Sequence, residues 1–220
     1  MIPACRRVVA GFCLATAMLV PCAAFGQAAY EVTAEKPVCE SLPSPEYGAG
    51  KKKFDPKMWL ALEAKIKVEP SKASSPPKGN TCERLKVRWY LLVDKLPEGQ
   101  SSANGRLLFT KEIEHVNIPL NEEVHCSVYL SPASLHRLTG QNLRDASKAA
   151  VQWGYEVEID GKILRGASDG QLKLTQADWW NIQSNLVERS TLIELLDKSK
   201  TPFNPLWWDR YAEIAPSDKP

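Results

Sequence analysis

Two tryptophan doublets are the side chains of this sequence best suited to bind another molecule. One doublet lies in QADWWN, and the other lies in TPFNPLWWDRY near the C-terminus. Indole rings stack on sugars or fill pockets of a partner protein, and tryptophan, tyrosine and arginine dominate the side chains that carry interface energy. We therefore predict an aromatic binding face. Its members are Trp179, Trp180, Trp207, Trp208, Arg210 and Tyr211.

The spacing of the doublets limits how they can be buried. Neighbouring side chains point to opposite faces of a strand and diverge by roughly 100° on a helix. One indole of each doublet should therefore lie outside the core that buries the other. Pro202 and Pro205 predict that the chain before Trp207 is extended and outside a sheet interior. Two outcomes stay open: the terminal segment packs across the domain and closes it, or its indoles are offered to a ligand.

Metal chemistry finds little support in the sequence. The chain has three histidines. Glu123 and His125 share a strand face but supply only two ligands, whereas His115 points away from Glu112 and Glu114. We predict no metal site and no cofactor.

Motifs for catalysis are also missing. There is no P-loop, no G-x-G-x-x-G and no G-x-S-x-G elbow, and GASDG places Ser168 in a turn. A carboxylate pair such as Glu156 and Glu158 leaves a glycosidase open, although solubility explains these two side chains equally well. The prediction is a protein without enzymatic activity.

The start of the chain has the order of a secretory signal. Arg6 and Arg7 precede an apolar run of 13 residues, VVAGFCLATAMLV, and small residues follow. We predict cleavage near Gly26 or Ala28 and a periplasmic or secreted location. Pro21 disfavours lipidation at Cys22, and no later stretch approaches the ~20 apolar residues of a membrane helix.

Loss of the signal changes the charge and the cysteine count. Residues 1–26 hold two arginines and no acid, so 28 basic against 26 acidic residues become 26 against 26. A neutral chain predicts no nucleic-acid partner. Cys39, Cys82 and Cys126 remain of the six cysteines. Cys126 alternates with apolar residues and is predicted to be a free buried thiol, whereas Cys39 and Cys82 are predicted to form a disulfide in an oxidising compartment.

Alternation of apolar and polar residues with a period of two predicts the strands of this chain. It runs through 58–68, 84–93, 106–118 and 123–130, and Asp160-Gly161 predicts a tight hairpin within 151–166. Ser131, Pro132 and Gly140 mark a short helix, and Asn142 is predicted to cap a second one that ends by residue 150. Residues 176–197 read either as one helix or as a helix near 176–185 followed by a strand.

These elements predict an antiparallel β-sandwich of immunoglobulin-like size with a helical insertion near 131–150. The predicted divisions are a signal peptide at 1–26, an extended arm at 27–56, the sandwich at 57–198 and a Trp/Pro-containing tail at 199–220. The predicted function is that of a structural or adaptor component of a cell-envelope assembly, docking an envelope protein through the aromatic face. A module that binds peptidoglycan or another glycan is the alternative, and an envelope hydrolase is the third reading.

Overall fold

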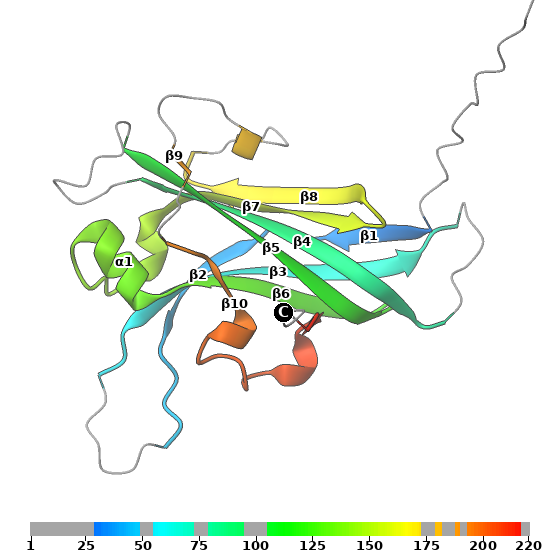
Figure 1. Ribbon diagram of the computed structural model, residues 1–220, viewed down its shortest axis with the longest axis horizontal. Coiled ribbons are helices and arrows are strands. Elements are labelled where there is room, and N and C mark those ends of the chain that lie inside the picture. The colour runs from blue at the N-terminus through cyan, green and yellow to red at the C-terminus, as the bar shows by residue number, and fades with distance from the viewer. Residues whose placement is uncertain are drawn as a thin grey trace, which may run out of the picture.

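The computed structural model describes residues 29–48, 55–72, 79–94, 105–172, 179–181, 188–189 and 193–216. Within them the chain forms a β-sandwich of two sheets, which confirms the predicted fold class (Figure 1). The predicted signal peptide and cleavage sites lie outside the described residues and stay predictions.

The first sheet is built around the long strand β3 (Met58–Pro70). One edge of β3 pairs with β6 (Glu123–Leu130), and the other pairs with β1 (Tyr30–Ala34) and β2 (Val38–Pro43). The two-residue strand β10 (Leu196–Asp197) extends the sheet beyond β6. The segment predicted as an extended N-terminal arm therefore supplies two strands of the sandwich, because Tyr30, Val32 and Ala34 alternate onto the core.

The second sheet is centred on β4, and all its pairings are antiparallel except the short one between β5 and β9. Its strand order is β11 (Glu213–Ile214), β5 (Arg106–Pro119), β4 (Thr81–Asp94), β7 (Ala150–Ile159) and β8 (Lys162–Gly170), with β9 (Glu188–Arg189) also on β5. Asp160 and Gly161 both adopt positive φ, 51° and 75°, in the turn between β7 and β8. The sequence predicts this turn correctly. The turn predicted at GASDG is wrong, because Ser168 lies on β8 and pairs with Gly154 of β7.

The helical insertion is smaller than predicted. Helix α1 (Pro132–Thr139) begins at the N-cap Ser131 and ends at Gly140 in the left-handed conformation, as predicted. The second predicted helix is a single 3-10 turn, η1 (Ala146–Ala149), and its cap is Asp145 rather than Asn142. Asp145 lies closer to the turn and accepts a hydrogen bond from the backbone of Ser147 at 3.2 Å.

One lateral edge of the sandwich is closed by the N-terminal strands. The hydroxyl of Tyr155 on β7 donates to the carbonyl of Glu35 at 2.6 Å, and the indole N–H of Trp153 donates to the carbonyl of Pro37 at 2.9 Å. These bonds join the second sheet to the link between β1 and β2. The opposite edge, between β6 and β5, is closed by the C-terminal segment.

Candidate binding site at the C-terminal edge

The C-terminal segment, residues 197–214, crosses from the first sheet to the second. It leaves β10 beside β6, runs through the 3-10 turns η3 (Lys198–Lys200) and η4 (Trp208–Arg210), and reaches β5 as β11. On the way the amide of Ala212 donates to the carbonyl of His125 on β6 at 2.9 Å. Figure 1 shows these orange and red elements below β6 and β10. The predicted tail is therefore the closing element of the sandwich edge.

An aromatic anchor fixes the segment to the outer face of the first sheet. Phe203 is buried, stacks on Tyr129 with ring centroids 5.0 Å apart and meets Trp59 edge-on at 5.6 Å. Leu206 packs against the same cluster. Trp59 lies on the face of β3 that the alternation assigns to half-exposed side chains. It is buried there because the segment returns over it.

A buried ammonium holds the turn together from inside. Lys198 donates to the carbonyls of Asn204 at 2.9 Å and Leu206 at 2.6 Å, and its Nζ lies 4.6 Å from the ring centroid of Tyr211. Burial lowers the pKa of Lys198. The charge is held by two carbonyl dipoles and an aromatic face, which replace part of the water that it loses.

A hydrogen-bond network fixes η4 to β3 and β6. His125 Nδ1 lies 2.8 Å from Oε1 of Glu63, and the hydroxyl of Tyr211 donates to the other carboxylate oxygen of Glu63. Burial, together with the contact to Glu63, raises the pKa of Tyr211. Nη2 of Arg210 lies 3.1 Å from Nε2 of His125. Because a guanidinium only donates, Nε2 accepts and the Nδ1 hydrogen goes to Glu63.

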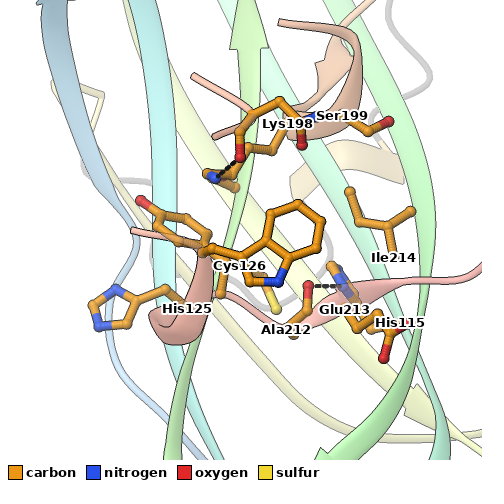
Figure 2. A pocket seen from close by; sticks show the side chains of 12 residues that line it. His115, His125, Cys126, Lys198, Ser199, Ala212, Glu213 and Ile214 are labelled. Carbon is orange, nitrogen blue, oxygen red and sulfur yellow. Dashed lines mark hydrogen bonds between the residues drawn. The ribbon is translucent and has the colours of Figure 1, made fainter. Parts of the chain in front are cut away.

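A cavity of about 390 Å³ lies beneath this segment and is called the edge cavity here. Figure 2 shows Lys198 and Ser199 on one side of it and Ala212, Glu213 and His115 on the other. The lining combines both sheets and the segment. It consists of His115, His125, Cys126, Ser127, Lys198, Ser199, Asn204, Trp208, Tyr211, Ala212, Glu213 and Ile214.

His115 is the buried titratable group of the edge cavity. Its side chain comes from β5, is 2% exposed and has Nδ1 3.2 Å from the carbonyl oxygen of Ala212. Burial lowers the pKa of His115 to about 4, against the opposing effect of the carbonyls of Ala212 and Glu213. The imidazole is therefore neutral at pH 7. Its Nε2 has no hydrogen-bond partner among the residues that the structure describes.

The predicted aromatic face is not a single surface. Trp179 and Trp180, in the 3-10 turn η2 (Trp179–Asn181), are each 4% exposed and cover the outer face of the second sheet. Trp180 stacks on Tyr90 with centroids 4.3 Å apart. Both indoles are buried in one cluster on the outer face of the same sheet, with their planes at 72°, so the expectation that one of them lies outside the core that buries the other is wrong here. The rest of the predicted helix near 176–185 lies outside the described residues.

The second doublet is exposed at both rings, so neither indole is buried in the core. The chain before it was predicted to be extended, and that prediction is wrong, because residues 202–207 form consecutive turns. Trp207 is 48% exposed and Trp208 is 68% exposed. Trp207 adopts a left-handed backbone with φ 51°, which turns the chain into η4. Arg210 and Tyr211 lie in the same segment as this doublet, whereas Trp179 and Trp180 do not. The structure thus brings together four of the six predicted binding residues.

The predicted disulfide is absent, and Cys39, Cys82 and Cys126 are all free thiols. Cys39 on β2 lies opposite Leu62, whereas Cys82 on β4 is near Tyr30, which lies opposite Pro70. Positions 62 and 70 are about 25 Å apart along β3, and a disulfide needs Cα atoms within about 7 Å. Sequence reasoning missed that separation because it placed Cys39 in a loose arm. Cys126 is fully buried, as predicted.

The carboxylates considered for catalysis are bound to cations and a phenol. Arg88 contacts Glu112 at 2.9 Å and Glu158 at 3.1 Å, and the hydroxyl of Tyr90 donates to Glu156 at 2.7 Å. These contacts form cross-strand pairs on the outer face of the second sheet. In the described part of the chain, no group of three or more His, Cys, Asp or Glu side chains is arranged to hold a metal ion.

Comparison with known proteins gives the family of the chain. A protein-family model matches residues 23–218. The chain belongs to that family. A crystal structure of a protein from Akkermansia muciniphila is similar over 86% of this chain and 94% of the other, with 32% sequence identity and a TM-score of 0.72. A search of curated proteins gives no match.

The match to the family model covers the C-terminal segment as well as the sandwich, because it extends to residue 218. None of the helices in the described ranges is long and apolar enough to cross a membrane.

Proposed function

We propose that this protein is a non-enzymatic, periplasmic or secreted adaptor of a cell-envelope assembly, and that it docks a partner protein on the indoles of Trp207 and Trp208. The observation that carries the proposal is the exposure of these two adjacent rings, 48% and 68%, on a segment that is anchored on both sides. Leaving two indoles in water favours association, and tryptophan and arginine are enriched where interfaces gain most of their energy.

The anchoring of the segment supports docking rather than loose exposure. Phe203 is seated on Tyr129 before the doublet, and Tyr211 is bonded to Glu63 after it. The rings are thus presented on a short turn whose ends are fixed. A preorganised surface loses less conformational entropy on binding, so more of the contact energy appears as affinity.

Assignment as an adaptor rather than a hydrolase rests on how the polar groups are engaged. In a catalytic triad, the histidine nitrogen opposite the carboxylate faces a nucleophilic hydroxyl. In this chain Nε2 of His125 faces Arg210 at 3.1 Å, and the hydroxyl of Ser127 donates to Tyr129 at 3.1 Å. The Glu63–His125 pair therefore serves to hold the C-terminal segment.

Photo-crosslinking in the intact envelope tests the proposal. A crosslinking amino acid replaces Trp207 in one strain and Ile163 in another, since Ile163 on β8 is 51% exposed and apolar but lies far from the segment. We expect position 207 to give one discrete protein adduct, whose identified partner crosslinks back to this segment. The adduct should be lost when Trp208→Ala is added. Equal adducts from positions 207 and 163, or none from 207, would contradict docking.

A glycan-binding module is the second candidate, because Trp208 offers an exposed ring beside a cavity with polar lining. Sedimentation with purified peptidoglycan separates the two functions. A glycan platform predicts co-sedimentation that Trp208→Ala abolishes without any protein partner. Failure to sediment together with a discrete crosslink at position 207 leaves the adaptor function alone.

A further inference from the structure

We propose that the contact between Arg210 and His125 is a pH-dependent latch: the neutral imidazole holds the turn η4 against β6, and the protonated imidazole releases it. The turn carries Trp208 and directly follows Trp207, so the latch also regulates the docking surface, and this part of the inference rests on the proposed function. The latch itself is a property of the isolated chain and is tested without a partner.

Arg210 is the side chain that ties η4 to the sheets. Residues 207–210 are all exposed. In the part of the chain that the structure describes, the hydrogen bond from Nη2 of Arg210 to Nε2 of His125, at 3.1 Å, is the one side-chain hydrogen bond that these four residues make. The firm anchors lie outside the turn, at Phe203 before it and at Tyr211 after it. The position of η4 between these anchors therefore depends on Arg210.

The contact requires a neutral imidazole. Nδ1 of His125 lies 2.8 Å from Oε1 of Glu63, and an ionised carboxylate only accepts, so we assign the single ring hydrogen to Nδ1 and a lone pair to Nε2. A second proton would go to Nε2, where it places an N–H donor and a positive charge against a guanidinium that only donates. The two cations repel each other, whereas the imidazolium gains an ion pair with Glu63. Protonation therefore strengthens the bond to Glu63 and breaks the bond to Arg210.

The charges around His125 leave Glu63 as the carboxylate that pairs with it. Lys65 lies directly opposite His125 in the register of β3 and β6, but it is engaged by Glu123 at 3.5 Å. The side chain of His125 is 11% exposed, so protons reach it from solvent. The charged and titratable side chains that face His125, or that line the edge cavity with it, are Glu63, Lys65, His115, Glu123, Lys198, Arg210, Tyr211 and Glu213.

Amide hydrogen exchange tests the latch on the isolated protein. The measurement is made at about pH 7.5 and about pH 5.5, on either side of the ordinary pKa of histidine, about 6.5, and is corrected for the intrinsic pH dependence of exchange. The amide of Arg210 bonds to the carbonyl of Trp207 at 3.0 Å within η4. We expect its protection to fall about tenfold in acid, while the amides of β7 keep theirs. Equal protection at both pH values, or an equal fall in β7, would overturn the latch.

Two variants connect the change to the proposed atoms. His125→Gln keeps a donor for Glu63 and an acceptor for Arg210 but cannot gain a proton, so the pH dependence of exchange at position 210 should disappear. Arg210→Met should give low protection there at both pH values. Retention of the pH dependence in either variant would refute the latch. If His125→Gln does not fold, the exposed Arg210→Met decides alone.

His115→Phe distinguishes the latch from the other buried histidine. His115 also responds to acid, but its bond is to the carbonyl of Ala212 and not to η4. The tenfold change at position 210 should therefore persist in His115→Phe. Its loss in this variant would assign the acid response to His115 and overturn the latch.

The crosslink at position 207, measured at the same two pH values, tests the effect on docking. A turn that is no longer held loses preorganisation, so we expect the yield of the discrete adduct to fall about tenfold in acid and to stay constant in His125→Gln. An equal yield at both pH values would overturn the regulation of docking. The lack of any adduct at either pH would contradict the adaptor function, whereas the latch is decided by hydrogen exchange.

Discussion

Two buried titratable side chains hold the C-terminal segment by opposite means. His115 gives up its charge, because burial lowers its pKa to about 4. Lys198 is also buried and its pKa is also lowered, yet its ammonium donates to two carbonyls and faces the ring of Tyr211. The ammonium donates to both of its carbonyls and faces a π surface, whereas for the imidazole the effect of burial outweighs that of the Ala212 and Glu213 carbonyls.

His115 should make the protein sensitive to mild acid. Between its unfolded pKa, about 6.5, and its folded pKa, about 4, the unfolded chain binds a proton that the folded chain does not. Stability from this group is therefore complete above pH 6.5 and falls as the pH drops towards 4, by about 3 kcal/mol in total. Urea unfolding at a series of pH values should show this loss, and His115→Phe should remove it. Parallel pH profiles for the two proteins would contradict the assignment.

Lys198 should contribute far more to the stability of the fold than its neighbour Lys200. Lys198→Met leaves two turn carbonyls without their donor and should lower the free energy of unfolding by about 1–3 kcal/mol. Lys200→Met is the matched control, because that side chain is 57% exposed and its ion pair with Asp197 is long, at 3.7 Å. It should change stability by less than about 0.5 kcal/mol. Urea denaturation of both variants measures the difference, and equal losses would refute the role given to Lys198.

At the scale of elements, two short irregular segments cover the outer faces of the two sheets. The turn η2 covers the outer face of the second sheet, and the C-terminal segment covers the outer face of the first. Each does so with aromatic rings on a few residues. Such turns need a close approach to the sheet, and Gly154 on β7 provides it for Trp180. A Cβ at Gly154 would lie 3.2 Å from Cζ3 of this indole and 3.0 Å from the carbonyl of Ala167.

Gly154→Ala should therefore loosen η2. The overpacked contact should cost about 1–3 kcal/mol and shift tryptophan emission to longer wavelength as Trp180 gains water. Gly166→Ala provides the matched control on the paired strand, because its Cβ would meet nothing closer than 3.5 Å. Thermal unfolding and emission spectra compare the two variants. An emission maximum that moves equally in both would show that Gly154 does not seat the indole.

Deleting residues 199–220 tests the C-terminal segment as a closing element. The deletion removes Phe203 and Ala212 from buried positions and frees the edges of β6 and β5. Loss of a buried phenylalanine alone costs about 3–5 kcal/mol, and open strand edges promote association. We expect a lower midpoint of unfolding and oligomers by light scattering. A monomer of unchanged stability would show that the segment is a dispensable tail.

For the whole molecule, the two lateral edges of the sandwich are closed by the two ends of the described chain. Residues 35–37 bridge the sheets at one edge, and the C-terminal segment bridges them at the other. This arrangement joins parts of the chain that are distant in sequence without a covalent link. Cys39, Cys82 and Cys126 stay apart on different strands, and burial raises the pKa of all three thiols.

The absence of a disulfide is directly measurable. Protein purified from an oxidising compartment should react with iodoacetamide at Cys39, Cys82 and Cys126 once it is unfolded without reductant. The folded protein should react slowly, because the thiolate is the reactive form and burial disfavours it. Intact mass spectrometry counts the added groups. If only one of these three thiols reacts after unfolding, the other two form a disulfide and the structure is contradicted on this point.

Local pattern alone determined the long strands β3, β4, β5 and β6, the α1 caps and the Asp160-Gly161 turn, because alternation, capping side chains and positive-φ residues act within a few positions. It also placed Cys126 in the core. Only the tertiary structure decided which doublet is buried, how far Cys39 lies from Cys82, and that His115 and the terminal segment enclose a cavity. Those features depend on which segments distant in sequence come to lie on the same sheet face or edge, and no spacing along the chain encodes that distance.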